Sequence, residues 1–534
     1  MRGASLRTRL RGWYASALRA GRRLGRWSWR TLPRGLRRPF RVVDRFDSWA
    51  YLDDLAAEIS RVLDDHAIEH LVLARRPLPL PRVILRRSQR GEVLSILARH
   101  GRRRGWWLAT TRLDTVGRAR PIGWRHWLLP GYSSVVVTAN LVSPAGDALV
   151  HAELGVVLEF WTELQQDTPT TGGGLAPKGT LRATRPNGVI DHAGTRLWPA
   201  IQANGHRLPG DHPHLLTVIE PIDLVYTWVD GSDPAWLARK AAALGAGTTA
   251  SYSADAAIDA RFESRDELRY SLRSVEMYAN WVRRIWVVTD RQVPSWLRQD
   301  ERLRVVDHSE IFADPSVLPV FNSHAIESQL HHIPGLADQY LYLNDDMLFG
   351  APVRPEDFFH GNGVGKFFTS PAVIDLDDHS LDDLAVTAAA KNNRDLVERA
   401  WSQTITNKLR HTPQPQSRRL LAAFEEARPE VFRAVMGSRF RSHDDRALPS
   451  SLSQYYAFAE GAAVTGRVTY GYLDLASRDA ATTLELWLHR RGMQCLCIND
   501  SGEGDPRARG KVDAALRAFF TGCYPVPSRW EDRR

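Results

Sequence analysis

A short apolar segment that ends in two adjacent carboxylates constrains this chain most. The segment is Tyr340–Leu343, and Asn344, Asp345 and Asp346 follow it directly. Its leucines and tyrosines are typical of a buried strand, and in an open α/β sheet the carboxyl ends of strands face the ligand crevice. Two neighbouring acids repel each other there, so we expect a divalent cation to compensate them. The alternative is an Asn-Asp-Asp turn that caps a helix.

A second acidic strand end lies upstream. The apolar stretch Pro221–Val229 is followed by Asp230, then Gly-Ser-Asp233 and Pro234. Pro234 suits the first turn of a helix, with Asp233 as its N-cap. A strand, a tight turn and a helix N-terminus together favour a phosphate or nucleotide site. Downstream, a predicted helix over 266–278 is followed by predicted strands at 281–290 and 305–309.

Four blocks of this sequence occur in a recognisable order. They run over Ile222–Pro234, Glu267–Asp346, His411–Asp445 and Cys497–Asp500, and the first 215 residues contain none of them. Together the blocks resemble the Stealth family of sugar-phosphate transferases. This family serves bacterial capsule and exopolysaccharide synthesis, and it includes the animal enzyme that places GlcNAc-1-phosphate on lysosomal glycoproteins.

The resemblance implies a reaction and a fold. We expect transfer of a hexose-1-phosphate from a nucleotide sugar, a UDP-sugar above all, to a hydroxyl of a saccharide acceptor, with release of a nucleoside monophosphate. We expect an α/β fold with a Rossmann-like nucleotide-sugar-binding core. One alternative is a metal-dependent glycosyltransferase that releases a nucleoside diphosphate. Another is a non-catalytic protein that binds polyanions or membranes.

Phosphoryl transfer needs a cation at the diphosphate, a base for the acceptor hydroxyl and a basic residue at the moving phosphoryl group. Asp345 and Asp346 are the candidate ligands for Mg²⁺ or Mn²⁺. Family resemblance makes His411 the candidate base. Arg441 is the candidate for the phosphoryl group, because a guanidinium fork suits phosphate oxygens. The resemblance also implies a set of substrate-binding residues: Asp230, Arg265, Glu267, Arg269, Asn322, Asn344, Asn499 and Asp500.

Glu327 is a candidate third oxygen ligand or an alternative base. It lies within 322–332, which we predict to form a helix. On a helix, Glu327 shares a face with Ser323 and with His331, because each is four residues away. His324 is predicted to be a polar surface residue rather than a ligand.

Net charge is uneven along the chain. The formal net charge is +10, and residues 1–40 hold twelve arginines and no acid, with tryptophans interleaved. We interpret this segment as a peripheral contact with an anionic membrane. The alternatives are nucleic-acid binding and a basic tail without a specific partner. Of the three interpretations we expect the membrane contact, and so we expect no nucleic-acid partner.

The expected location is cytoplasmic, with contact at the inner face of the plasma membrane through the basic segment. No apolar run approaches the length of a spanning helix, and we expect no signal peptide. Three cysteines argue against a disulfide framework, and Cys495 and Cys497, which alternate with Leu496 and Ile498, predict a buried strand.

We predict three parts of the chain. Residues 1–44 form the basic segment, 45–215 a small α/β accessory domain, and 216–534 the catalytic domain. A helical insertion is expected at about 380–435, with helices at 395–409 and 417–434.

Overall fold

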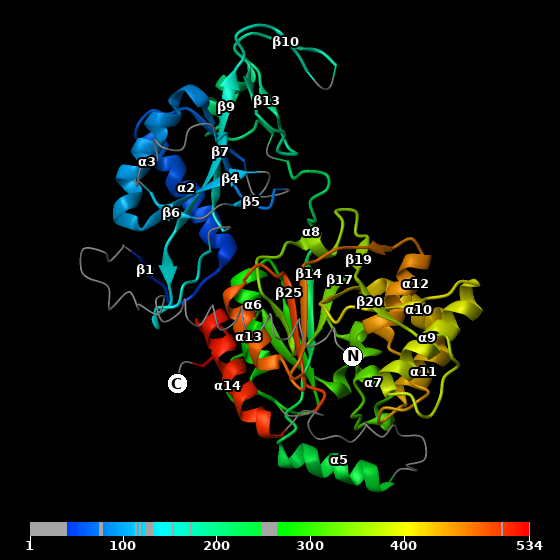
Figure 1. Cartoon of the computed structure of the whole chain (residues 1–534). Coiled ribbons are helices and arrows are strands. Elements are labelled where there is room, and N and C mark those ends of the chain that lie inside the picture. The colour runs from blue at the N-terminus through cyan, green and yellow to red at the C-terminus, as the bar shows by residue number, and fades with distance from the viewer. Residues whose placement is uncertain are drawn as a thin grey trace, which may run out of the picture. The chain divides into compact units, whose positions relative to one another are not determined.

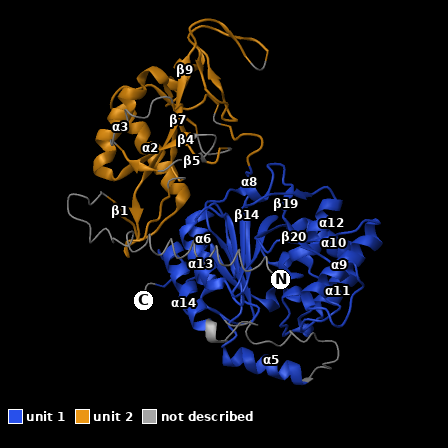
Figure 2. Ribbon diagram, viewed as in Figure 1, with its two compact units in different colours: residues 1–18, 218–534 blue, residues 19–217 orange. Residues whose placement is uncertain are grey.

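The computed structural model describes ten stretches of the chain (Figure 1). They are residues 40–73, 78–112, 115–116, 119–122, 132–151, 154–170, 173–210, 212–246, 264–502 and 506–532. A boundary between Thr217 and Val218 separates two compact units (Figure 2). The arginine-rich segment 1–39 lies outside the described residues, and so does the membrane contact predicted for it. Within the described part, no helix is long and apolar enough to cross a membrane.

The unit after Val218 is built on a five-stranded sheet. In spatial order its strands are β16 (Leu303–Asp307), β15 (Ile285–Thr289), β14 (Ile222–Thr227), β17 (Gln339–Asn344) and β22 (Gln414–Ser417). The first four run parallel, and β22 pairs antiparallel with β17. Both strands predicted to end in carboxylates, β14 and β17, are therefore confirmed and central, and the predicted α/β class is confirmed.

The order of the parallel strands reverses between β14 and β17. From β14 the chain builds outward through β15 and β16, and it then returns to place β17 on the other side of β14. Thr227 and Asn344, the last residues of the two strands, are register partners. In open α/β sheets, ligands bind at such a reversal, outside the carboxyl ends of the strands. The acidic turn Asp345–Asp346 begins at this point.

A second sheet continues directly from that turn. β18 (Met347–Phe349) pairs antiparallel with β25 (Cys495–Asn499), which pairs parallel with β24 (Tyr470–Asp474). Met347 is the register partner of Cys497, and the carbonyl of Asp346 accepts the N–H of Ile498 at 3.0 Å. These contacts fix Cys497 beside the acidic turn.

Helices cover both faces of the main sheet (Figure 1). One face carries α6 (Glu267–Tyr278), α13 (Ala480–His489) and α14 (Pro506–Cys523); the other carries α7 (Ser323–Glu327), α9 (Ala385–Trp401), α10 (Arg418–Ala427), α11 (Pro429–Met436) and α12 (Ser453–Ala459). The helix α5 (Pro234–Ala246) follows β14, and Asp233 accepts the N–H of Ala235 at 2.9 Å. The predicted N-cap is thus confirmed.

Two helix predictions were wrong in part. The stretch 322–332 is not one helix, because α7 ends at Glu327 and a separate 3₁₀ turn covers Leu330–His332. The hydroxyl of Ser328 donates to the carbonyl of Ala325 at 2.7 Å, which is a local alternative to helix continuation. The predicted helix 395–409 ends at Trp401, since Ser402 has a φ of 53°. Residues Asn407–Leu409 instead form β21, which pairs with β20 (Thr369–Val373).

An ion pair to a buried carboxylate anchors the amino end of β14. Asp223 is fully buried, and Arg283 donates to it at 2.6 and 2.8 Å. Trp286 Nε1 and the N–H of Ala337 also donate to Asp223, at 3.0 and 2.9 Å. A buried carboxylate is tolerated when it is paired and its lone pairs are satisfied. This cluster ties β14 to its neighbours at the end of the sheet opposite the acidic turn.

The unit before Val218 contains a nine-stranded sheet. Its longer strands are β3 (Arg82–Arg86), β9 (Val156–Glu163), β7 (Ser134–Ala139) and β4 (Trp106–Arg112). The helices α2 (Ser48–Asp64) and α3 (Arg90–Arg104) pack on this sheet (Figure 1). Apolar residues of α2 at positions 52, 55, 59 and 63 are buried, as their helical spacing predicts.

Candidate active site

Three carboxylates gather at the carboxyl ends of β14 and β17. Loss of solvation, together with the nearby Glu267 and Asp346 carboxylates, raises the pKa of Asp345 well above its ordinary value. Burial, with a further contribution from Asp346, raises the pKa of Glu267 to about 7. The neighbouring negative charges therefore make ionisation of Asp345 and Glu267 less favourable. This repulsion is the electrostatic signature expected of a site that binds a cation.

The donor set fits a hard divalent cation. All three side chains offer carboxylate oxygen, which Mg²⁺ and Mn²⁺ prefer. Asp346 Oδ1 is buried, and no hydrogen-bond partner lies near it among the described residues. A buried oxygen without a partner is costly, and a cation would satisfy it. Glu267, Asp345 and Asp346 are thus close enough to interact electrostatically, and the metal-binding role of Asp345 and Asp346 stays a prediction.

His411 faces Asp346 across the acidic turn. His411 Nδ1 lies 3.7 Å from Asp346 Oδ2 and 3.1 Å from the sulfur of Cys497. The Cys497 thiol donates to Asp346 Oδ2 at 3.3 Å. Burial, and then Asp346, raise the pKa of Cys497 well above its ordinary value, so the sulfur carries its proton here. A histidine, a thiol and a carboxylate therefore form one contiguous group.

A chain of hydrogen bonds sets the orientation of His411. The Tyr342 hydroxyl donates to Asn344 Oδ1 at 2.6 Å, which turns the amide nitrogen of Asn344 toward His411 Nε2 at 3.3 Å. An amide N–H can only donate, so Nε2 is the acceptor and Nδ1 carries the proton toward Cys497. Nε2 is then the nitrogen with a lone pair available to a substrate proton.

Glu327, on α7, lies next to Tyr342, a member of this chain of hydrogen bonds. It is 3% exposed, and it accepts the hydroxyl of Ser450 at 2.7 Å. Burial, followed by the nearby Glu327 carboxylate, raises the pKa of Tyr342 well above its ordinary value. Tyr342 therefore lies between Glu327 and Asn344. The structure thus links Glu327 to His411 through two intervening side chains, although whether Glu327 is a base or a metal ligand stays a prediction.

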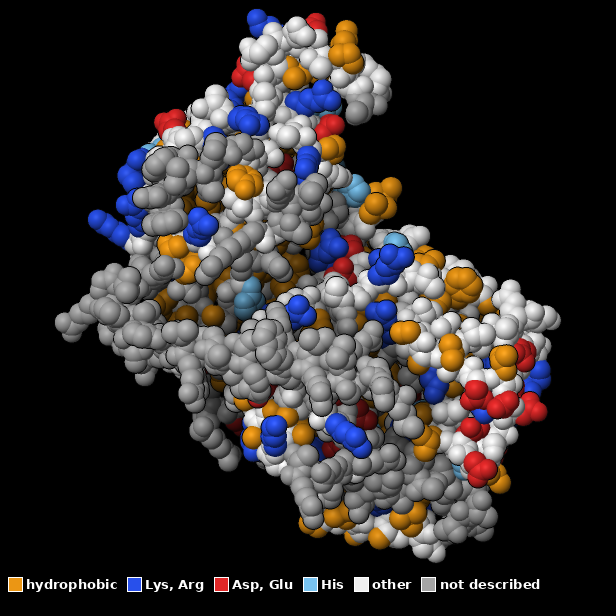
Figure 3. All heavy atoms as spheres, in the orientation of Figure 1, with side chains coloured by type: hydrophobic (Ala, Val, Ile, Leu, Met, Phe, Trp, Pro, Cys, Tyr) orange, Lys and Arg blue, Asp and Glu red, His pale blue; other side chains and the backbone are white. Residues whose placement is uncertain are grey.

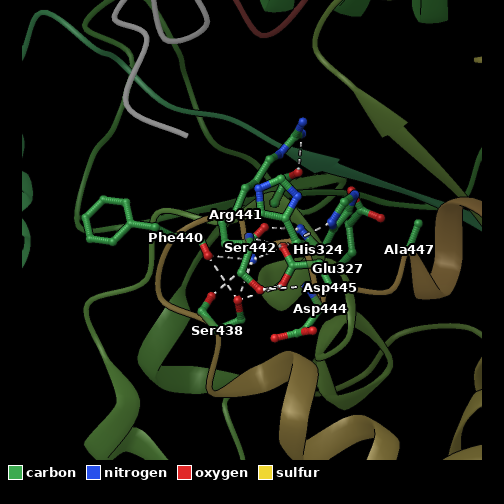
Figure 4. A network of polar contacts seen from close by, with 12 residues as sticks. His324, Glu327, Ser438, Phe440, Arg441, Ser442, Asp444, Asp445 and Ala447 are labelled. Atoms are coloured by element: carbon green, nitrogen blue, oxygen red, sulfur yellow. Dashed lines mark hydrogen bonds and ion pairs between the residues drawn. The ribbon is translucent and has the colours of Figure 1, made fainter. Parts of the chain in front are cut away.

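Arg441 contacts the amino end of the helix that carries Glu327. Its Nη2 donates to the hydroxyl of Ser323, the first residue of α7, at 2.9 Å. Figure 4 shows Arg441 beside His324 and Glu327. Arginine is suited to a phosphate group through its planar donor fork, and this position puts it on the α7 side of the site.

The loop after Arg441 is held by Asp445 (Figure 4). The Asn322 amide donates to Asp445 Oδ2 at 2.8 Å and to the carbonyl of Ser438 at 3.1 Å. Asn322 Oδ1 accepts the N–H of His324 and caps α7. His324 lies 3.5 Å from Asp445 and is 5% exposed, so the surface position predicted for it was wrong. The Asn322 side chain therefore forms its hydrogen bonds with other groups of the protein. Its contact with substrate stays a prediction.

Arg265 joins two predicted substrate-binding segments. It forms an ion pair with Asp500 at 2.7 Å and lies 3.5 Å from Asp513. Its backbone N–H donates to the carboxylate of Glu267. The turn after β25 is thereby brought against the start of α6. Arg265, Glu267 and Asp500 are therefore close together, and their role in substrate binding stays a prediction.

Three other predicted substrate residues contact different segments. Asp230 accepts the N–H and the hydroxyl of Ser232 at 2.9 and 2.6 Å, within the turn before α5. The Arg269 guanidinium lies 4.8 Å from the ring centre of Trp296 and 3.7 Å from Glu531. Asn499 is the register partner of Asp474 at the end of β25. Their roles in binding stay predictions.

The acidic segment 375–383 has a local explanation. Lys391 on α9 is buried, and its ammonium group lies 2.8 Å from Asp375 and 3.1 Å from Asp383. Figure 3 shows acidic side chains gathered on the side of the molecule where α9 lies. Two aspartates of the segment therefore neutralise a buried lysine.

Reasoning from the sequence missed Cys497, Tyr342 and Asp445. Alternation on β25 predicts that Cys497 is buried, and it is. Only the pairing of β25 with β18 shows that its sulfur faces Asp346 and His411. The sequence indicated Tyr342 only as an apolar strand residue, and it did not reveal the hydrogen bond of its hydroxyl group to Asn344. Asp445 belongs to the third block of the resemblance, but its buried hydrogen bond with Asn322 joins segments distant in sequence.

Comparison with known proteins identifies three regions of this chain. Residues 220–248 match Stealth protein CR1, conserved region 1; residues 261–367 match CR2, conserved region 2; residues 410–458 match CR3, conserved region 3. These regions contain β14, the acidic turn, His411 and Arg441. They agree with the first three blocks of the resemblance, and the fourth block, Cys497–Asp500, stays a prediction.

Curated relatives align with 60 to 83% of this chain. The exopolysaccharide phosphotransferase SCO6023 of Streptomyces coelicolor is 41% identical over 466 residues, which cover 83% of this chain and 76% of the relative. SCO6021, of the same name and organism, is 39% identical over 430 residues, covering 77% of this chain and 76% of the relative. The exopolysaccharide phosphotransferase CpsY of Mycobacterium tuberculosis is 37% identical over 325 residues, or 60% of this chain and 59% of CpsY.

Among solved structures, the galactosyltransferase LgtC in complex with donor and acceptor sugar analogues aligns with 58% of this chain and 99% of its own. The sequence identity is 13% and the TM-score is 0.28. This likeness is too low to support an inference about fold or activity.

Proposed function

Because the chain belongs to the Stealth family of exopolysaccharide phosphotransferases, we propose that it is an enzyme that transfers a hexose-1-phosphate from a nucleotide sugar to a hydroxyl of a saccharide acceptor. The donor is a UDP-sugar, and the released product is a nucleoside monophosphate. The core around β14 and β17 is a Rossmann-like nucleotide-sugar site. The observation that carries this proposal is the contact between His411 and Asp346 where the strand order reverses.

The reaction forms one bond and breaks one bond. The acceptor hydroxyl oxygen bonds to the β-phosphorus of the donor, and the oxygen bridge between the two phosphates leaves with the nucleoside monophosphate. His411 Nε2 takes the hydroxyl proton, since this nitrogen is the acceptor in its hydrogen bond with Asn344. The imidazolium that results is stabilised by the Asp346 carboxylate on its Nδ1 side.

Two further groups act on the phosphates. Mg²⁺ or Mn²⁺ held by Asp345 and Asp346 would neutralise charge on the diphosphate and position it. Arg441 stabilises the negative charge on the phosphoryl group during transfer. Its bond to Ser323 supports this assignment because it fixes the guanidinium next to α7. Arg265 and Asp500 bind the donor on the α6 side, where Glu267 lies.

A panel of nucleotide sugars tests this reaction class. The purified protein is incubated with each donor, with Mg²⁺ or Mn²⁺ and with saccharide acceptors, and the released nucleotide is identified. Release of UMP supports phosphotransfer. Release of UDP would assign the chain to the alternative class, the metal-dependent glycosyltransferases, which break the bond between the sugar and oxygen.

A further inference from the structure

The group Asp346, His411 and Cys497 has the dimensions of one face of a zinc site. Sγ and Nδ1 are 3.1 Å apart, Sγ and Oδ2 are 3.3 Å apart, and Nδ1 and Oδ2 are 3.7 Å apart. Tetrahedral zinc, with bonds of about 2.0 to 2.3 Å, separates its ligand atoms by about 3.3 to 3.5 Å. Each side of the triangle is within about 0.4 Å of that range, so small side-chain shifts bring the three atoms to one ion.

We propose that Asp346, His411 and Cys497 bind a zinc ion, and that zinc bound there inhibits the enzyme. Thiolate and imidazole favour zinc over magnesium or manganese, which favour oxygen. The hard cation of the proposed reaction and zinc share Asp346, so one displaces the other. Zinc binding stands on the geometry alone, whereas inhibition also rests on the proposed function.

The surroundings of the triangle suit an ion that enters from solvent. The His411 side chain is 35% exposed and that of Asp346 is 15% exposed, whereas Cys497 is fully buried on β25. Three protein ligands then leave the fourth position of a tetrahedral ion open on the exposed side. Zinc replaces the thiol proton on Cys497, and that proton passes to solvent.

Asn344 supplies the outer hydrogen bond that a zinc-bound histidine requires. With zinc on His411 Nδ1, the ring proton moves to Nε2, which already faces the Asn344 amide. Rotation of this amide by a half turn presents Oδ1 as the acceptor. Tyr342 can then donate to Glu327, which lies close to it. Such an outer partner orients the ring and strengthens metal binding.

Two other groups of the described residues also bring together possible metal ligands, but neither contains sulfur. They are Asp64, His70 and His206 in the unit before Val218, and His331, His332 and Glu425 in the unit that begins at Val218. A probe that reports sulfur coordination therefore separates the proposed site from both. Co²⁺ takes the place of zinc in such sites, and cobalt–thiolate bonding gives a charge-transfer absorption band in the near ultraviolet.

The experiment titrates Co²⁺, and then Zn²⁺, into the full-length protein under reducing conditions. We expect one Co²⁺ per chain with the thiolate band, and loss of that band when Zn²⁺ is added. Cys497→Ser and His411→Gln should remove the band and weaken Zn²⁺ binding by about 100-fold or more. Cys495→Ser and Cys523→Ser, which replace buried thiols outside the group, are matched controls and should keep the band. Absence of the band from the wild-type protein, or its persistence in Cys497→Ser, would overturn the zinc site.

The inhibition is measured separately, as the ratio of each protein's Mg²⁺-supported rate with and without micromolar Zn²⁺. We expect this ratio to fall strongly for wild type and for Cys495→Ser, and far less for Cys497→Ser. Thermal melting of each variant shows whether it is folded, and Cys497→Ala replaces Cys497→Ser if the latter is not. Equal inhibition of wild type and folded Cys497→Ser would refute the inhibitory role. Cobalt binding without turnover of any nucleotide sugar would count against the proposed function and leave the zinc site standing.

Discussion

His411 Nδ1 lies 3.7 Å from Asp346 Oδ2, although the two residues come from separate conserved regions of the chain. Asp346 follows β17 at the edge where the strand order reverses, and His411 lies at the same edge, in the segment just before β22. The antiparallel pairing of β22 with β17 is what brings the two segments together. The candidate base is thereby placed beside a candidate metal ligand.

Removal of the cation is the first test of the carboxylates. We expect EDTA to abolish turnover and Mg²⁺ or Mn²⁺ to restore it, because the carboxylates would otherwise repel the donor diphosphate. Asp346→Asn should lower kcat by about 100-fold or more. The control Asp382→Asn lies in the acidic segment near α9 and should retain the wild-type rate. Full activity in EDTA would rule out the metal role.

The same carboxylates should limit stability. Repulsion and loss of solvation raise the pKa of Asp345, so its ionised form opposes folding at neutral pH. Asp345→Asn should therefore raise the melting temperature in EDTA while it reduces activity, as a trade between stability and function. Melting curves in EDTA and in Mg²⁺ check this. An unchanged or lower melting temperature in EDTA would show that the charges are compensated within the protein.

His411 and Arg441 should matter for the chemical step more than for donor binding. We expect His411→Ala and Arg441→Ala to lower kcat by about 100-fold or more each, with a much smaller change in donor affinity. His192→Ala, which replaces an exposed histidine in the unit before Val218, is the control. Steady-state kinetics and donor binding by calorimetry separate the two quantities. Wild-type kcat in either variant would refute its assigned role.

The buried His308 predicts how stability depends on pH. Burial lowers its pKa from 6.5 to about 4, so the unfolded chain takes up a proton below about pH 6.5 that the folded chain excludes. Stability contributed by this residue is therefore complete above pH 6.5 and falls as the pH drops toward 4, by at most about 1.4 kcal/mol per pH unit. We measure the free energy of unfolding with urea between pH 7 and 5. It should fall less steeply with decreasing pH in His308→Leu than in wild type, whereas replacement of the exposed His212 by Gln should leave the pH dependence unchanged. Equal pH dependence in wild type and His308→Leu would contradict the account.

Local sequence rules predicted the parts of the fold that depend on neighbouring residues. Short runs of apolar residues located β17 and β25, and Asp233 with Pro234 located the start of α5. The acidic residues that follow β14 and β17 could also be predicted, because they too depend only on neighbouring residues in the sequence. The spatial order of the strands, which makes these ends a site, follows from packing over the whole sheet.

Errors arose where distant contacts decided the structure. His331 does not share a helical face with Glu327, because its Nε2 lies 2.7 Å from Glu425 on α10 and the helix ends before it. Residues 407–409 form a strand because β20 lies next to them. The sulfur of Cys497 reaches Asp346 and His411 only through the pairing of β25 with β18. None of these partners is near in sequence.

The arginine-rich segment 1–40 predicts reversible membrane binding. Each basic residue near an anionic surface contributes about 1 kcal/mol, and salt should weaken the attraction. We expect the full-length protein to sediment with anionic vesicles at low salt, to be released at high salt and to ignore zwitterionic vesicles. A chain without residues 1–40 should stay in the supernatant. Equal sedimentation of both proteins would contradict a membrane role for this segment.

The position of bond cleavage tests the central claim most directly. A UDP-sugar that carries ³²P only in its β-phosphate is incubated with the enzyme, Mg²⁺ and the saccharide acceptor, and the products are separated. Phosphotransfer predicts that the label moves to the acceptor together with the sugar and that UMP is unlabelled. Label retained in UDP, with the sugar alone on the acceptor, would contradict the account and show that the chain is a glycosyltransferase.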